Sequence, residues 1–218
     1  MVSMRQYSYT DEQITVWLQG LLSIAWVDGH FSTEEQVLMT TLMEQDLSLT
    51  LDVGAAITVS PTEVAGILGQ DPPMAENFLR TAVMVAIADG TYSLPEDQLI
   101  HQFCTALGQQ PKILEPLRLT LIHRTNGISS FSAERLLGPV QDWLNHLEVH
   151  DPRLARFLCK MIPSQCPFER DVKLFGHKIV HIPPMCKLNP LYEQLVGLRF
   201  RALSYLADDC QEDVTKYC

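Results

Sequence analysis

The sequence predicts a mainly α-helical protein, and three observations lead to that prediction. Apolar residues recur at helical spacing along much of the chain. Several of these periodic segments begin with Ser or Thr followed three residues later by Glu or Gln, the pattern that caps a helix N-terminus. With 46% hydrophobic and 19% charged residues among 218, the chain has enough apolar material for one large domain or two small ones.

The first helix is expected to begin at residue 11, because Thr10 and Gln13 form a capping box. Leucine, alanine and tryptophan then repeat at helical spacing as far as Trp26. The helix should end at Asp28-Gly29, where the glycine supplies the left-handed residue that commonly closes a helix.

The turn after this helix is repeated at an offset of 61 residues, which predicts two copies of a helix, tight turn, helix unit. In each copy a second capping box, Ser-x-x-Glu, opens the next helix. The matching residues are Asp28, Gly29, Phe31, Ser32 and Glu35 in the first copy, and Asp89, Gly90, Tyr92, Ser93 and Glu96 in the second.

Between and after the two copies, further helices are expected. Ser60 caps a helix that carries Pro61 at its first position, and Pro72-Pro73 marks a break before the second copy. Later helices are predicted over 111–124 and 133–147, separated by a turn at Asn126-Gly127.

The doubled Asp-Gly-x-aromatic-Ser-x-x-Glu turn, each time after an Ala-rich apolar helix, resembles the TerB-like (tellurite-resistance-associated) helical fold over roughly residues 10–125. The resemblance implies an all-α bundle and divalent-metal binding by the acidic residues of the turns, namely Asp28, Glu35, Asp89 and Glu96. Capping is the alternative, since a Ser-x-x-Glu box accounts for both serines and both glutamates without a metal.

The C-terminal part is expected to hold a short helix over 153–161 and a short hairpin with Gly176 at its turn, because residues 179–182 are largely β-branched. A last helix should start with Pro190 at its first position and end near Asp208. Its apolar face would consist of Leu191, Leu195, Leu198, Ala202 and Tyr205.

Charge divides the chain in two. Residues 1–140 carry 6 basic and 16 acidic side chains, a net charge of −10, whereas residues 141–218 carry 10 of each. Within the second part, residues 152–207 have a net charge of +6. This asymmetry supports two units with a boundary near 125–145. We therefore expect a first domain over 1–128, which carries the TerB-like resemblance, and a smaller, cysteine- and proline-rich α domain over 129–218.

A second resemblance lies in the C-terminal part. The stretches Cys-Pro-Phe-Glu-Arg-Asp at 166–171, His-Ile-Pro-Pro-Met-Cys-Lys-Leu-Asn-Pro-Leu-Tyr at 181–192 and Leu-Arg-Phe-Arg-Ala-Leu-x-Tyr-Leu at 198–206 resemble the family named for the C-terminal region of molybdenum-dependent nitrogenase. That family is mostly cyanobacterial. Together the two resemblances imply a cyanobacterial protein of the cytoplasm, without a match to a nitrogenase catalytic subunit.

The cysteines suggest a candidate metal site, for which an iron–sulfur cluster and Zn are the two cofactors considered. Two prolines, Pro183 and Pro184, stiffen the chain beside Cys186. No Cys-x-x-Cys pair, the strong signal for such sites, is present, so buried structural thiols are the alternative. The predicted ligands are Cys166, Cys186 and Cys210, with Cys159 or His181 as the fourth.

The expected function is non-enzymatic, because the sequence contains no nucleotide-binding, nucleophile or metalloprotease motif. A net charge of −10 argues against nucleic acid as a partner, and no apolar run is long enough for a signal peptide or a transmembrane segment. Two hypotheses follow: a metal- or iron–sulfur-linked adaptor, assembly or sensing protein, and a metal-free adaptor for a protein partner. A weaker third is peripheral membrane contact through Lys173, Lys178, Lys187, Arg199 and Arg201.

Overall fold

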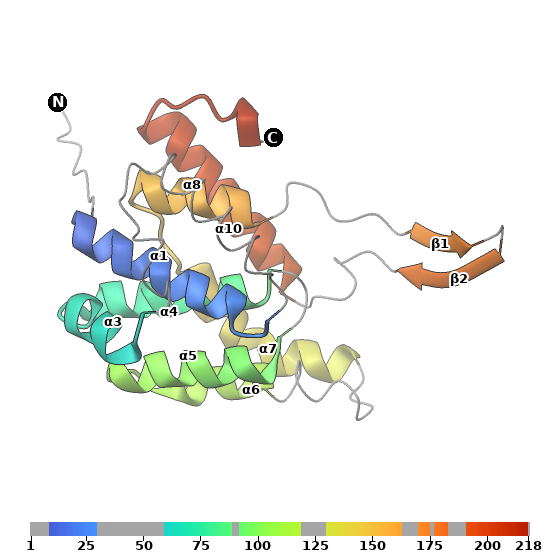
Figure 1. Ribbon diagram of the computed structural model, residues 1–218, viewed down its shortest axis with the longest axis horizontal. Coiled ribbons are helices and arrows are strands. Elements are labelled where there is room, and N and C mark those ends of the chain that lie inside the picture. The colour runs from blue at the N-terminus through green and yellow to red at the C-terminus, as the bar shows by residue number, and fades with distance from the viewer. Residues whose placement is uncertain are drawn as a thin grey trace.

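The computed structural model (Figure 1) describes residues 9–29, 59–88, 92–118, 130–162, 170–174, 177–182 and 191–217. Of residues 130–135 and of the two strands it describes the backbone only. The fold is mainly α-helical, as predicted. Its elements in chain order are α1 (Asp11–Trp26), α3 (Pro61–Leu68), α4 (Pro72–Ala86), α5 (Leu94–Ala106), η1 (Pro111–Leu114), α6 (Glu115–Leu117), α7 (Ser130–Asn145), α8 (Pro152–Met161), β1 (Arg170–Leu174), β2 (His177–Ile182), α10 (Tyr192–Ser204), η4 (Tyr205–Asp209) and η5 (Thr215–Tyr217).

Three predicted helix starts are confirmed by the cap geometry. The hydroxyl of Thr10 accepts a hydrogen bond from the amide of Gln13 and begins α1. Ser60 caps α3 in the same way, with proline at the first helical position. Ser93 caps α5 as part of a complete capping box. These starts could be predicted because each cap satisfies amides only three residues away.

The first Asp-Gly turn also has the predicted backbone. Gly29 has φ of +76°, and its amide donates a 3.1 Å hydrogen bond to the carbonyl of Trp26. A side chain at this φ would be strained, which explains the glycine. The equivalent Gly90, together with the capping box of Ser32 and Glu35, lies outside the described residues.

Two predicted helices differ from the structure. The segment after Pro111 begins as the 3₁₀ turn η1 before the short α6, because Pro116 has no amide to donate to the carbonyl four residues earlier. The last helix begins at Tyr192 rather than at Pro190, because Leu191, with φ of −108° and ψ of 16°, has a non-helical backbone and forms the N-cap. Its predicted apolar face is confirmed, since Leu191, Leu195, Leu198 and Ala202 are buried and Tyr205 is partly buried against them.

The predicted hairpin is present. Strands β1 and β2 pair antiparallel in a two-stranded sheet, with Val172 opposite Val180 and Lys173 opposite Lys178. The register shifts between Val172 and Lys173. Figure 1 shows this hairpin standing away from the helical body.

The core is built around three aromatic side chains that are fully buried: Trp17, Phe78 and Phe103. Phe78 meets Trp17 and Phe103 edge-on, with centroid distances of 5.8 and 5.4 Å, a favoured aromatic geometry. Helix α1 approaches α4 closely at Gly20, where a Cβ would lie 2.8 Å from the ring of Phe78.

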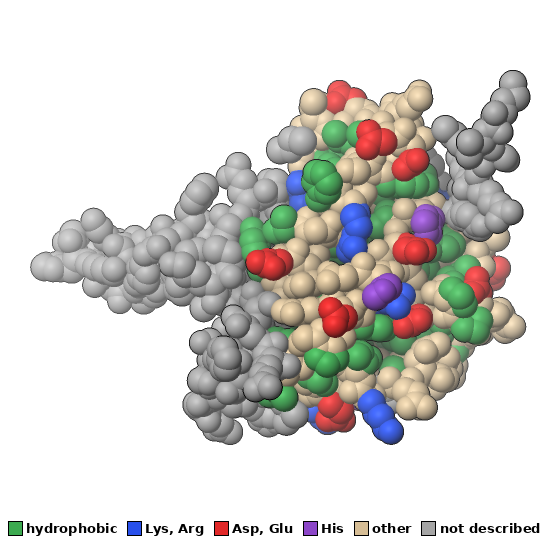
Figure 2. Space-filling view, turned by 180° about the vertical axis from the view of Figure 1, so that it is seen from behind, with side chains coloured by type: hydrophobic (Ala, Val, Ile, Leu, Met, Phe, Trp, Pro, Cys, Tyr) green, Lys and Arg blue, Asp and Glu red, His purple; other side chains and the backbone are tan. Residues whose placement is uncertain are grey.

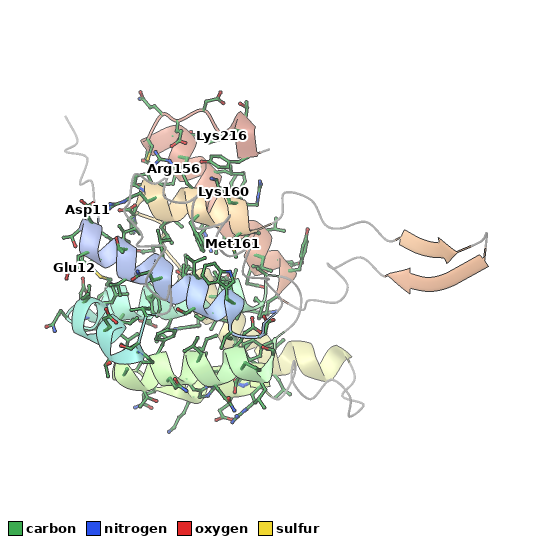
Figure 3. All side chains as sticks on the ribbon, in the orientation of Figure 1. Asp11, Glu12, Arg156, Lys160, Met161 and Lys216 are labelled. Carbon is green, nitrogen blue, oxygen red and sulfur yellow. The ribbon has the colours of Figure 1, made fainter. Side chains whose placement is uncertain are left out.

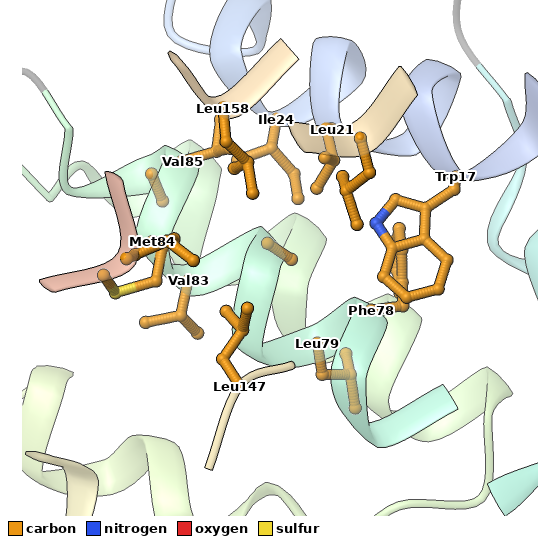
Figure 4. Packing of buried hydrophobic residues seen from close by; sticks show 14 of the residues in the cluster. Trp17, Leu21, Ile24, Phe78, Leu79, Val83, Met84, Val85, Leu147 and Leu158 are labelled. Atoms are coloured by element: carbon orange, nitrogen blue, oxygen red, sulfur yellow. The ribbon is translucent and has the colours of Figure 1, made fainter. Parts of the chain in front are cut away.

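This core continues across the predicted domain boundary. Leu147 and Leu158 pack with Leu21, Ile24 and Val83 in one cluster (Figure 4). The side-chain amide of Asn77 pairs with both backbone groups of Glu148, at 2.7 and 2.9 Å. Such bonds bind α4 to the segment that precedes α8. The division into domains 1–128 and 129–218 stays a prediction.

Candidate functional site

A groove lies between α8, the C-terminal end of α10 with η4, and the segment that links α7 to α8; we call it the C-terminal groove. Its volume is about 860 Å³, and its walls include Glu148, His150, Arg156, Phe200 and Asp209. Every lining residue lies between positions 147 and 212. The C-terminal part of the chain therefore forms this groove by itself, at a size typical of binding sites, which span about 300–1,000 Å³.

Tyr205 fixes one wall of the groove. Its hydroxyl donates a 2.8 Å hydrogen bond to the backbone carbonyl of His150. Burial raises the pKa of Tyr205, and the neighbouring Cys210 raises it further. The hydroxyl therefore stays protonated at neutral pH and holds the α7–α8 segment against α10.

Cys210 lines the groove beside Tyr205. Burial raises the pKa of its thiol, and the hydrogen bond with Tyr205 opposes that rise without cancelling it. Because the thiolate is the nucleophilic and metal-ligating form, Cys210 is held in its less reactive state at neutral pH.

The backbone at the end of α10 widens into the π-helical turn η4. The amide of Cys210 donates to the carbonyl of Tyr205, five residues earlier, at 3.1 Å. Gln211 then has φ of +54°, and the chain reverses so that its last residues return toward α8. Turns of this kind are frequent at functional sites. Sequence reasoning missed it, because no glycine marks the position of positive φ.

An ion-pair cluster fastens this returning segment to α8. Both Nε and Nη2 of Arg156 lie 2.8 Å from one carboxylate oxygen of Glu212, and Lys216 Nζ lies 3.1 Å from the other. Arg156 and Lys216 occupy the facing surfaces of α8 and the C-terminal segment (Figure 3). Burial by itself would raise the pKa of the Glu212 carboxyl. The interactions with Arg156 and Lys216 outweigh this effect, so the pKa is lowered.

Exposed apolar side chains lie on α10, and one of them, Phe200, lines the groove. Phe200, which is 69% exposed, and Val196, which is 46% exposed, lie one turn apart on α10. Leu195 and Leu198 of the same helix are buried in the core. Figure 2 shows the helical body from behind, where hydrophobic, acidic, basic and histidine side chains are interspersed. An exposed aromatic ring beside a concave surface is typical of a protein-binding site.

The predicted cysteine ligands are only partly described. Cys159 is 4% exposed on α8, and Cys210 follows η4, which packs against α8. Cys166, Cys186 and the side chain of His181 lie outside the described residues. In the part of the chain that the structure describes, no three His, Cys, Asp or Glu side chains come together as a metal site. The metal-site hypothesis stays a prediction.

The acidic residues of the two Asp-Gly turns are also partly described. The carboxylate of Glu96 accepts a 2.7 Å hydrogen bond from the amide of Ser93, as a capping box requires. Asp28 is half-buried at the end of α1. Glu35 and Asp89 lie outside the described residues. The capping explanation is thus confirmed for Ser93 and Glu96.

Two of the five basic residues considered for membrane contact are engaged within the protein. Arg199 donates to the backbone carbonyls of Ile162 and Tyr217. Arg201 donates a 2.9 Å hydrogen bond to the carbonyl of Asn145, and burial lowers its pKa. Among the described residues, no helix is both long and apolar enough to cross a membrane.

Sequence reasoning missed a buried carboxylate near the second turn. The side chain of Asp97 is 1% exposed and accepts a 3.1 Å hydrogen bond from the hydroxyl of Tyr92. Arg118 Nε lies 3.1 Å from its other oxygen, outside hydrogen-bond geometry, so this contact is ionic. Burial, followed by the charge of Asp97, raises the pKa of Tyr92. This cluster joins the start of α5 to the end of α6.

Comparison with known protein families gives a match to the C-terminal part of the chain. Residues 136–218 match the family model described as Mo-dependent nitrogenase C-terminus. The chain matches no curated protein and no solved structure. The matched region includes all residues that line the C-terminal groove, and it supports the C-terminal resemblance seen in the sequence. The TerB-like resemblance of the N-terminal part stays a prediction.

Proposed function

We propose that this protein is a non-enzymatic adaptor that docks a protein partner in its C-terminal groove. The observation that carries the proposal is Phe200, a large aromatic side chain left 69% exposed at the edge of an 860 Å³ groove. Aromatic side chains of this kind supply much of the binding energy at protein interfaces. The groove also lies wholly within the region that matches a known family.

The polar groups around the groove support binding rather than catalysis. Tyr205 is bonded to a backbone carbonyl, Arg156 is paired with Glu212, and burial disfavours the thiolate of Cys210. These contacts stabilise the groove walls, and they leave the exposed carboxylates of Asp208 and Asp209 as polar groups that a partner would meet. A fixed surface of this type suits recognition, because little conformational entropy is lost when a partner binds.

The family description names molybdenum-dependent nitrogenase. A protein connected with that enzyme, or with its assembly, is therefore the first partner to test, in the cytoplasm of a cyanobacterium. We assign residues 10–125 to the TerB-like helical fold on their repeated turns, and we take this N-terminal part as the scaffold on which the groove is mounted.

A second candidate is a metal-linked adaptor. It is favoured by Cys159 and Cys210, which lie on α8 and just after η4, two elements that pack together. Cys166 and Cys186 would complete an iron–sulfur or zinc site, with His181 as the alternative to Cys159 for the fourth ligand. Elemental analysis and absorption spectroscopy of protein purified without oxygen test this candidate. A metal that is lost in the Cys210→Ser variant would support it, whereas metal-free protein with no visible absorption would contradict it.

The adaptor proposal is tested by quantitative affinity capture from cyanobacterial extract. We compare the Phe200→Asp variant with Leu94→Asp, a matched control because Leu94 is 47% exposed on α5, away from the groove. The proposal expects proteins that are captured by the wild type and by the control and are lost with Phe200→Asp. Equal capture by all three forms would overturn it.

A further inference from the structure

The C-terminal groove carries acidic side chains that have no basic partner among the residues the structure describes. Asp208 and Asp209 line it, are exposed, and form no ion pair with the described residues. Among the described residues, the side-chain carboxylate of Glu148 pairs with His150, at 2.8 Å. Arg156 is already paired with Glu212, and Arg201 is half-buried and bonded to a backbone carbonyl. The groove therefore presents a negative rim beside the exposed ring of Phe200.

The hairpin formed by β1 and β2 carries the opposite charge, with more basic than acidic residues. Its strands contain Arg170, Lys173 and Lys178 against one acid, Asp171, among β-branched residues. The register places Lys173 directly opposite Lys178, and like charges in opposed positions destabilise a strand pair. Hairpins of two strands are marginally stable by themselves. Binding to an acidic, partly apolar surface would reduce the repulsion between the two lysines and would stabilise the two-stranded hairpin.

The two surfaces do not meet within one chain. Figure 1 shows the hairpin directed away from the body, while the groove lies where α8, α10 and the C-terminal segment come together. A second copy of the chain would supply the missing surface to each. Because every copy carries one hairpin and one groove, two reciprocal contacts would close a symmetric dimer.

We infer that the hairpin of one copy docks in the C-terminal groove of a second copy, with Lys173 and Lys178 beside Asp208 and Asp209. The inference rests on the proposed function, since it names a partner for the same groove. Ion pairs between lysine and aspartate would form at the rim of the groove, and apolar side chains of the hairpin would pack on Phe200. The dimer should therefore weaken as salt is added, because exposed ion pairs are screened.

Sedimentation velocity of the full chain, in reductant and over a range of concentrations, tests the inference. The wild type should show a reversible monomer–dimer equilibrium. Reversing either charge set, by Lys173→Glu with Lys178→Glu or by Asp208→Lys with Asp209→Lys, should weaken association by about tenfold or more, because like charges then face each other. The variant with all four substitutions should regain it. Lys112→Glu, at an exposed lysine of η1, is the control and should dimerise as the wild type does.

Three results would overturn the inference: a wild type that stays monomeric at every concentration, charge-reversed variants that still dimerise, or a four-residue variant that does not recover. Circular dichroism of each variant establishes that loss of the dimer is not loss of folding. A monomeric wild type whose Phe200→Asp variant nevertheless loses a captured protein would leave the proposed function standing and this inference alone refuted.

Discussion

Arg153 forms a bidentate ion pair with Asp151, whose side chain is completely buried. Nε and Nη2 of the guanidinium lie 3.1 and 2.9 Å from the two carboxylate oxygens. The same arginine donates to the carbonyl of Tyr9, and the amide of Tyr9 donates to Asp151. The ion pair therefore joins the start of the first helix to the start of α8, 142 residues away in sequence.

Removing one partner of this pair should be costly. We predict that Arg153→Ala lowers the free energy of unfolding by about 3–5 kcal/mol, because it leaves the carboxylate of Asp151 buried without a counter-charge. Chemical denaturation measures the change. Asp11→Asn is the control, since the side chain of Asp11 also contacts Arg153 but is 90% exposed, and it should cost at most about 1 kcal/mol. Equal effects of the two variants would contradict the prediction.

The sequence was informative about local structure and poor on such long-range contacts. The capping residues Thr10, Ser60 and Ser93 could be predicted because a cap and the amides it satisfies are near neighbours in sequence. The pairing of Asn77 with Glu148 spans 71 residues, and no local pattern encodes it. The hairpin was predicted from its β-branched residues, but nothing in the sequence indicated the π turn after α10.

For the candidate site, sequence reasoning found Cys210 and the apolar face of α10 but not the groove. The groove depends on the reversal at Gln211 and on the bond from Tyr205 to His150, both of which are visible only in three dimensions. The ligand set built on the cysteines stays a prediction, since Cys166 and Cys186 lie outside the described residues.

The ion pairs of Glu212 with Arg156 and Lys216 should make the free energy of unfolding depend on pH. The pKa of Glu212 is lowered in the folded protein from an ordinary value of 4.5. The stabilisation is therefore present above pH 4.5 and is lost as the pH falls through the lower, folded-state pKa. We predict that wild type is more stable than Glu212→Gln at pH 7 and that the difference shrinks below pH 4.5. Denaturation at several pH values measures it. A difference independent of pH would show that the charge of Glu212 does not contribute.

Because α1 approaches α4 closely at Gly20, we expect a change from glycine to alanine there to destabilise the protein, although alanine normally favours a helix. Gly20→Ala should destabilise the protein by about 1–3 kcal/mol, because the new Cβ overlaps the buried ring of Phe78. Gly66→Ala in α3 is the matched control, since no atom lies within 4 Å of its Cβ position. That change should stabilise by up to about 1 kcal/mol through helix propensity. Thermal unfolding distinguishes the two signs, and stabilisation by Gly20→Ala would refute the packing argument.

The second Asp-Gly turn should owe its stability to capping. Ser93→Ala is predicted to cost about 0.5–2 kcal/mol, the usual loss for an N-cap. Added Ca²⁺ or Mg²⁺ should leave the melting temperature of the wild type unchanged. A rise that is abolished by Asp28→Asn together with Asp89→Asn would instead support divalent-metal binding by the turns, as the TerB-like resemblance implies.

The central claim is that a protein partner covers Phe200. Its most direct test is photo-crosslinking in living cells, with a photoreactive phenylalanine analogue at position 200 of the full chain and, separately, at position 94. We predict a discrete protein adduct, identified by mass spectrometry, from position 200 and none from position 94. No adduct from position 200, or the same adducts from both positions, would contradict the account.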